Sequence, residues 1–246
     1  MVTRLSATLL AGGSLFLCET ARAADWYTGA EPQKPDSSWL VTLDTSANVT
    51  SNQSAFASTT ITVVPRADES GFRLRAEGVI GEYKYRASNN VNVRGYQQEG
   101  SLLAGYELVW KDAALAGYVG LHVRNNGLSY ADPNNSVVGT EYGAKVAASF
   151  YATPTDNTFV SAYGSYSTTF NAYYTRVRAG VMVADGVYVG PEALLLGDNF
   201  FQQWRVGVHL TGLSLGPVNV STAVGYVQDR VQKGGYYSTV EARMNF

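Results

Sequence analysis

The feature that most constrains the fold is a two-residue alternation that runs unbroken to the end of the chain. From Tyr236 to Phe246, Val240, Ala242 and Met244 share one face with both ends, whereas Glu241 and Arg243 occupy the other. Successive side chains of a β-strand point to opposite sides, so this pattern predicts a strand that separates two environments. Chain ends usually fray. An aromatic last residue in a two-faced strand therefore indicates that the end is tied into a sheet.

The same separation of charge from apolar side chains recurs along the chain. In segment 71–84, Arg73 and Arg75 alternate with Phe72 and Leu74, and segments 95–110, 137–151, 171–184 and 200–213 repeat the pattern. A cation facing lipid at the bilayer midplane costs roughly 2–4 kcal/mol. We therefore assign the charged face to the lumen of a barrel and the apolar face to lipid.

A soluble barrel such as a lipocalin uses the same alternation with the faces inverted, so the alternation alone leaves both folds open. Two features favour the membrane. One is the terminal Phe246. The other is the position of aromatic residues on the apolar face near strand ends, as in the interfacial girdles of membrane barrels: Trp110, Phe150 and Tyr142.

Twelve strand candidates follow one another at the regular spacing of an all-β protein. They span residues 39–49, 56–65, 71–84, 95–110, 113–124, 137–151, 158–167, 171–184, 187–197, 200–213, 217–228 and 235–246. The predicted fold is an all-β, 12-stranded antiparallel transmembrane β-barrel of the outer-membrane type, covering residues 39–246. Gly190-Pro191 interrupts the ninth candidate, and because proline cannot donate a ladder hydrogen bond we expect a bulge or kink there.

The connections between candidates alternate in character. Every second one is a short turn, such as Lys111-Asp112 or Asp185-Gly186, and several of the others are longer and rich in Asn, Ser and Gly. Short turns on one side and longer loops on the other are typical of outer-membrane barrels. An even strand number also returns the C-terminus to the side where the barrel begins.

The N-terminal residues resemble a secretory signal peptide. Arg4 gives a positive start, Leu5 to Leu17 is an apolar stretch too short to span a bilayer, and Ala21-Arg22-Ala23 is a cleavage site. We expect a Sec-type signal peptide at 1–23, cleavage near Ala23 and a polar periplasmic lead-in at 24–38. Lipidation of Cys18 is the less favoured alternative, because Leu17 is large where a lipobox needs a small residue.

Phe246 resembles the C-terminal assembly signal of bacterial outer-membrane proteins. We therefore expect the outer membrane of a Gram-negative bacterium as the location, outer-membrane lipid as the surroundings, and the barrel-assembly machinery as a partner during insertion. The net charge of −2 gives no indication of a nucleic-acid partner. Cys18 is the only cysteine, and no metal-ligand spacing or nucleotide motif occurs, so we expect neither metal nor cofactor.

The lumen is expected to hold a polar network. Its members share the charged parity and form a candidate polymer or ion path: Arg73, Arg75, Glu77, Glu107, Glu141, Lys145, Arg176, Arg178, Glu192, Arg205, His209, Glu241 and Arg243. Glu99 and Arg124 share that parity. Either these charges pair across strands and plug the lumen, or a narrow water-filled path or ligand groove remains, since twelve strands enclose more room than eight.

Catalytic chemistry has little support in this sequence. Outer-membrane lipid hydrolases use a Ser–His arrangement, but both histidines, His122 and His209, are predicted to face the lumen, away from acyl chains. No carboxylate pair can be assigned. We predict no catalytic residues and no enzyme activity, with a lipid hydrolase as the least favoured alternative.

One C-terminal block resembles a known family. Gly190-Pro191-Glu192, Gly197-Asp198, and Gln203-Trp204-Arg205 followed by His209 and Gly212 are similar to the cellulose biosynthesis protein BcsS family. By parity, Glu192, Arg205 and His209 face the lumen and Trp204 faces lipid. The resemblance implies a non-catalytic accessory role in bacterial cellulose production or export, with cellulose and other secretion components as partners. The alternatives are a small general porin and a surface-loop adhesion barrel.

Overall fold

The structure is a computed structural model that describes residues 40–66, 69–230 and 233–246. The expected signal peptide at 1–23 and lead-in at 24–38 lie outside the described residues. In the described part, no helix is long and apolar enough to cross a membrane.

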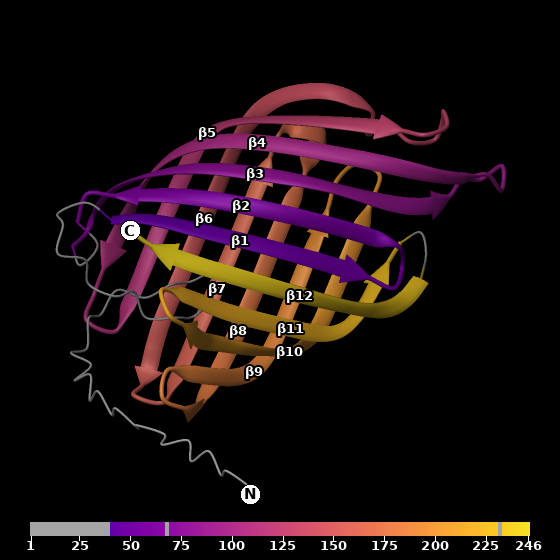
Figure 1. The fold of residues 1–246 in the computed structure, drawn as a ribbon. Helices are drawn as coiled ribbons and strands as arrows, with labels where there is room; N and C mark the ends of the chain where they lie inside the picture. Colours follow the sequence, from indigo (N-terminus) through magenta and orange to yellow (C-terminus); the bar gives the residue numbers. More distant parts are fainter. Residues whose placement is uncertain (1–39, 67–68, 231–232) are drawn as a thin grey trace, which may run out of the picture.

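In the part of the chain that the structure describes, twelve antiparallel strands form one closed barrel, as predicted (Figure 1). The strands are β1 Leu40–Thr50, β2 Ser54–Val64, β3 Gly71–Arg86, β4 Asn92–Val109, β5 Ala113–Leu128, β6 Gly139–Thr155, β7 Thr158–Ser167, β8 Tyr173–Ala184, β9 Val187–Gly197, β10 Gln202–Leu215, β11 Val218–Asp229 and β12 Lys233–Asn245. A short 3₁₀ turn, η1 (Thr169–Asn171), separates β7 from β8. Each strand pairs with its sequence neighbours, and β12 returns to pair with β1.

The seam between β1 and β12 closes the barrel through the residues that the sequence singled out. The ladder runs from Thr42 opposite Asn245 to Thr50 opposite Tyr237. Phe246 extends it, because its N–H donates to the Val41 carbonyl at 2.9 Å and its carbonyl accepts from the Val41 N–H at 3.1 Å. The alternating C-terminal run thus completes a sheet that has no free edge.

The two ends of the barrel differ. One end, here named the turn end, carries the connections after β2, β4, β6, β8 and β10 together with Phe246. Gly186 and Gly216 take positive φ there, at 67° and 63°, in the tight hairpins after β8 and β10. The opposite end, named the loop end, carries the longest connection, residues 129–138 between β5 and β6.

Strands β3 to β6 are longer than the rest, with 16, 18, 16 and 17 residues. A tilted strand needs about 9–11 residues to cross the hydrocarbon core of a bilayer. These four strands therefore continue beyond it, and Figure 1 shows the β3–β4 hairpin projecting past neighbouring strands at the loop end.

The outer surface is apolar over the strands and the inner surface is charged. Phe72, Leu121 and Tyr142 are 74%, 73% and 79% exposed, whereas Arg73 and Arg178 are each 1% exposed. Water does not stabilise such an exterior, but lipid does. The inverted arrangement of a soluble barrel is therefore excluded, and the fold is a transmembrane barrel.

A substitution in the middle of the lipid face tests this orientation. Val208 lies mid-strand in β10 and is exposed on the outer surface. We expect Val208→Arg to reduce the free energy of unfolding by roughly 2–4 kcal/mol in lipid vesicles. Leu215→Arg is the matched control: Leu215 is 66% exposed, against 58% for Val208, but ends β10 beside its turn, where the cost falls to roughly 0–1 kcal/mol. Equal costs in urea titrations would contradict the assignment.

The bulge predicted at Gly190-Pro191 is absent. A side-chain hydrogen bond instead replaces the one that the proline cannot donate. β9 keeps its register against β10 from Gly197 to Tyr188, and the register shift toward β8 lies nearer the turn, between Met182 and Ala184. The Ala179 carbonyl on β8 accepts a hydrogen bond from His209 Nε2 at 3.1 Å. Because Pro191 has no N–H to donate, the His209 side chain supplies the hydrogen bond that the Ala179 carbonyl accepts, and β9 keeps its register against β10.

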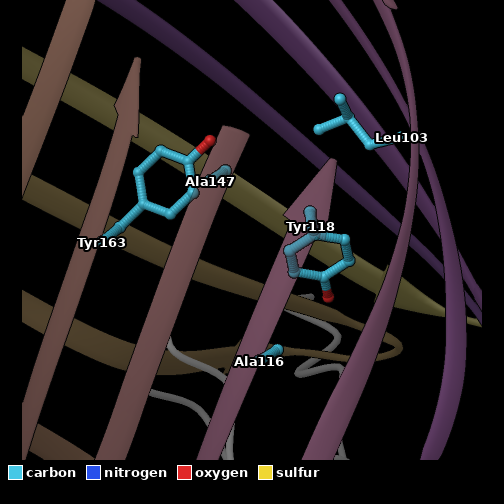
Figure 2. Close-up of a cluster of buried hydrophobic side chains, with 5 residues drawn as sticks. All are labelled: Leu103, Ala116, Tyr118, Ala147 and Tyr163. Carbon is cyan, nitrogen blue, oxygen red and sulfur yellow. The ribbon is translucent and has the colours of Figure 1, made fainter. Parts of the chain in front are cut away.

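Inside the barrel, aromatic rings and small residues pack together. Figure 2 shows one such cluster, in which Tyr118 and Tyr163 project inward among Leu103, Ala116 and Ala147. A second cluster lies toward the turn end, where the ring of Phe159 stacks on Tyr151 at 5.9 Å and meets Tyr188 edge-on at 5.1 Å. Side chains therefore fill part of the space that the twelve-stranded sheet encloses.

Candidate functional site

The predicted interior residues lie on the inner face of the barrel, in three groups. Those in the middle belong to an ionic layer, and Glu77, Glu141, Lys145 and Arg205 lie toward the loop end. Toward the turn end, Arg73 pairs with Glu107, whereas Arg75 and His209 contact aromatic rings. Of the residues in the family block, Glu192, Arg205 and His209 are buried inside, and Trp204 is exposed outside against Tyr226 at 5.6 Å.

The ionic layer consists of Asp44, Arg176, Arg178, Glu192, Glu241 and Arg243. Arg178 donates to Glu192 at 2.5 Å and to Glu241 at 2.7 Å, and Arg176 donates to Glu241 at 2.5 Å. β8 and β12 are not neighbours in the sheet, so the bonds from Arg176 and Arg178 to Glu241 cross the lumen. The Tyr237 hydroxyl also donates a hydrogen bond to Glu192 at 3.0 Å.

Asp44 and Arg243 complete the layer at the seam. Arg243 donates to both carboxylate oxygens of Asp44, through Nε at 2.6 Å and through Nη2 at 2.9 Å, which is the bidentate geometry of a strong pair. Three carboxylates and three guanidinium groups make the layer neutral. Buried charges persist only when they are paired and hydrogen-bonded, and this arrangement meets that condition.

Among the described residues, the bonds of the layer reach across the lumen. Arg178 and Glu241 are each 1% exposed even though both project into the barrel. Side chains this little exposed leave little room for water around them. His209 and Phe159 lie further toward the turn end with their rings 5.6 Å apart, and the His209 Nδ1 contacts the Thr211 hydroxyl at 2.9 Å.

Two arginines of β3 line the wall beside the layer. Arg73 donates to Glu107 at 2.7 Å and to the carbonyl of Glu69 at 2.8 Å. Arg75 lies over the Tyr118 ring at 4.0 Å and donates to the Tyr118 hydroxyl at 3.1 Å. These contacts hold the two long side chains against the barrel wall and give each guanidinium group a partner.

A cavity of about 250 Å³ lies between the ionic layer and the loop end, and is named here the loop-end cavity. Charged pairs line it, with Lys145 and Glu77 at 2.6 Å, Arg124 and Glu99 at 3.3 Å, and Arg124 and Asp198 at 2.7 Å. The Arg124–Asp198 bond joins β5 to the residue after β9, so it also crosses the barrel. Ser, Thr, Asn and Gln side chains and several aromatic rings complete the lining.

The connection between β5 and β6 folds over the mouth of this cavity. Asp132 accepts a hydrogen bond from the Tyr85 hydroxyl at 2.9 Å, and Asn135 donates to the same hydroxyl at 3.1 Å. Val137 is buried and lines the cavity. The Phe200 ring packs on Tyr85 at 5.2 Å from the other side. The loops thus narrow the loop end without filling the space beneath it.

His122 forms a Ser–His–Glu row in the cavity. Its Nδ1 lies 2.6 Å from the Ser167 hydroxyl, and its Nε2 lies 3.6 Å from Glu99, beyond hydrogen-bond range. Ser167 is buried, and its oxygen also accepts the Thr169 N–H at 3.1 Å. A nucleophile needs an exposed oxygen and a base held by a hydrogen bond to its third partner, whereas Ser167 is 2% exposed and Glu99 lies outside hydrogen-bond distance of His122. No group of three metal-binding side chains occurs among the described residues.

Sequence reasoning missed several residues of this interior: Asp44, Asp198, Phe56, Tyr83, Phe200 and Phe201. Asp44 and Asp198 carried a usable signal, since Asp44 shares the parity of Thr42 and Asp198 shares that of Glu192. The aromatic residues had no such signal, because parity gives the face of a tyrosine but not its height in the barrel.

The model of the cellulose biosynthesis protein BcsS family matches residues 45–246. The chain belongs to this family. The match covers all but the first five residues of β1 and every later strand, and it confirms the resemblance drawn from Gly190-Pro191-Glu192 and the block around Trp204. The chain's role therefore lies in cellulose biosynthesis.

Solved structures with a similar fold are outer-membrane barrels of low sequence identity. The translocator domain of autotransporter NalP from Neisseria meningitidis is 12% identical, with 85% of this chain and 89% of that chain covered and a TM-score of 0.50. The TodX monoaromatic hydrocarbon channel deltaS2 mutant is 8% identical, with 84% and 88% covered and a TM-score of 0.50. The KdgM porin is 11% identical, with 83% and 99% covered and a TM-score of 0.47. At these identities the likeness shows the fold alone. A comparison with curated proteins gives no match.

Proposed function

We propose that this protein is a non-catalytic accessory component of cellulose production in the outer membrane of a Gram-negative bacterium. Its turn end faces the periplasm and its loop end faces the cell surface. The barrel does not conduct the polymer. Instead it presents its loop end to cellulose or to the other components of the secretion system.

The ionic layer is the observation that supports this proposal. A polymer path would need a lumen that stays open along its length, whereas four buried side chains bonded to one another, Arg176, Arg178, Glu192 and Glu241, reach across this lumen beside the buried Asp44–Arg243 pair. The residues considered above as a path act on this proposal as a plug. A plugged barrel in a cellulose biosynthesis family is better suited to organising export at the surface than to carrying it.

Conductance measurements test the plug. We expect the purified barrel to insert into planar bilayers without steady single-channel conductance, because Arg178 and Glu241 fill the lumen. The double variant Arg178→Ala with Glu241→Ala is the positive control: it removes one cation and one anion, keeps the net charge and shortens both crossing side chains. Steady conductance of the unaltered protein would support the general-porin alternative and count against the plug.

Cellulose output tests the accessory role. We expect deletion of the gene to lower cellulose yield or to change fibril form, and complementation with the unaltered gene to restore both. Because the proposal is non-catalytic, Ser167→Ala should complement as well as the unaltered gene. Unchanged yield and fibril form after deletion would overturn the role, and failure of Ser167→Ala would revive the hydrolase alternative.

A further inference from the structure

We infer that the loop-end cavity is a binding site for a short, neutral carbohydrate, such as the end of a glucan chain. The choice of glucan rests on the proposed role in cellulose production, and the choice of a neutral sugar rests on the cavity itself. The site is a blind recess that holds a chain end at the cell surface, not a segment in transit.

Aromatic rings lie flat against the cavity wall and leave one face toward the space. The Phe56 ring on β2 covers Gly81 on β3, where an added Cβ would come within 2.1 Å of it. The Tyr83 ring on β3 covers Gly95 on β4 in the same way, at 2.3 Å. Glycine on the neighbouring strand thus makes room for each ring to lie along the sheet.

Such ring faces suit a sugar. The face of an aromatic ring carries the negative part of its quadrupole, and the C–H bonds on one side of a pyranose ring are weakly positive, so the two stack. The Phe201 ring lies 6.5 Å from Tyr83 with planes 29° apart, which extends the aromatic surface across the mouth of the cavity. Phe56, Tyr83 and Phe201 all line the cavity.

The polar groups that line the cavity are balanced in charge. Glu77, Glu99 and Asp198 are matched by Lys145, Arg124 and Arg205. The balance gives no net attraction for an anion or a cation, whereas paired carboxylates and guanidinium groups offer strong acceptors and donors for hydroxyls. The cavity therefore favours a neutral ligand rich in hydroxyl groups.

An unsatisfied histidine nitrogen at the wall points to a missing partner. His122 is buried, lines the cavity, and its Nε2 has no hydrogen-bond partner among the described residues. The adjacent Glu99 oxygen is 3.6 Å away. A buried polar atom without a partner costs about 1–3 kcal/mol. A ligand hydroxyl beside Glu99 provides that partner, since a hydroxyl both donates to a carboxylate and exchanges a bond with an imidazole nitrogen.

Calorimetry on the full barrel in detergent tests the site with cellotriose as the probe. We expect binding of cellotriose, and weaker or no binding of a uronic-acid trisaccharide of the same length. Glu99→Gln should weaken cellotriose binding about tenfold or more, because a hydrogen bond to a charged group is replaced by one to a neutral group. Tyr83→Leu, which keeps an apolar side chain but removes the flat face, should also weaken it.

Glu82→Gln is the matched control, since Glu82 lies on β3 beside Tyr83 but on the outer face of the barrel, does not line the cavity, and contacts only Arg94 at 3.7 Å among the described ion pairs. It should bind cellotriose like the unaltered protein. Heat-shifted gel mobility confirms that each variant is folded. No binding of cellotriose, equal binding of the uronic acid, or equal effects of the two glutamate substitutions would overturn the inference.

The inference and the proposed function fail in different ways. Loss of cellulose on deletion without any cellotriose binding would retain the accessory role and overturn the sugar site. Cellotriose binding that Glu99→Gln weakens, together with unchanged cellulose after deletion, would retain the site and overturn the accessory role.

Discussion

Replacing Glu241 with glutamine is expected to destabilise the barrel by about 3–5 kcal/mol, the cost of removing one partner from a buried ion pair. Glu241 accepts from Arg176 at 2.5 Å and from Arg178 at 2.7 Å, and all three side chains are buried. The amide keeps the shape but carries no charge. Two guanidinium groups would then share Glu192 as their remaining anion within the layer, in a region that water does not reach.

Urea titration of the barrel in lipid vesicles, followed by tryptophan fluorescence, measures this change. Glu82→Gln is again the matched control, because the Arg94–Glu82 pair is 3.7 Å apart with side chains 44% and 42% exposed. Such surface pairs contribute about 0–1 kcal/mol. Unfolding midpoints that fall equally for the two variants would show that the ionic layer contributes no more than a surface pair.

The strands and their faces could be read from the sequence because lipid and lumen impose opposite chemistries on alternate residues. All twelve strands occur within a few residues of their predicted bounds, and Arg73, Arg75 and Glu241 point inward as their parity required. The seam was also foreseeable. A barrel has no edge, so an alternating last strand ending at Phe246 has only the first strand left to pair with.

The partners across the lumen were not foreseeable. Arg178 and Glu241 are 63 residues apart and lie on strands that do not neighbour each other. Parity states that both face inward, but their meeting depends on how far each strand is staggered around the barrel. That stagger is a property of the closed sheet as a whole. The sequence therefore predicts which charges are inside without predicting which of them plug the lumen and which line a cavity.

The loop end shows a second limit. Residues 129–138 have the Asn and Pro content of a solvated loop, yet Asp132, Asn135 and Val137 are buried. The burial follows from Tyr85, whose hydroxyl bonds both Asp132 and Asn135 on the wall that β3 extends above its neighbours. Local composition cannot report a partner that lies more than forty positions away.

Replacing Gly190 with alanine is expected to destabilise the barrel by about 3 kcal/mol, the upper part of the range for overpacking a closed interior. The Ala179 carbonyl occupies the space of the missing side chain, since a Cβ on Gly190 would come within 1.9 Å of that oxygen. The same carbonyl accepts from His209 Nε2 at 3.1 Å. Alanine would displace backbone, not a flexible side chain, and would take the carbonyl from its donor.

Gly164→Ala is the matched control, because the nearest atom to a Cβ at Gly164 in β7 is the Thr175 hydroxyl at 3.8 Å. Alanine there should leave the barrel unchanged or stabilise it by about 0.4–1 kcal/mol through the unfolded chain. Urea titrations in parallel are therefore expected to show stability changes of opposite sign for the same chemical change on two strands.

His209→Ala should reduce the free energy of unfolding by about 1–3 kcal/mol, the cost of an unsatisfied buried carbonyl. If Gly190→Ala and Gly164→Ala changed the free energy of unfolding equally, Gly190, Pro191 and His209 would not act together to stabilise the sheet. If they differ as expected, Gly190 and His209 together allow β9 to pair with both neighbouring strands although it contains Pro191.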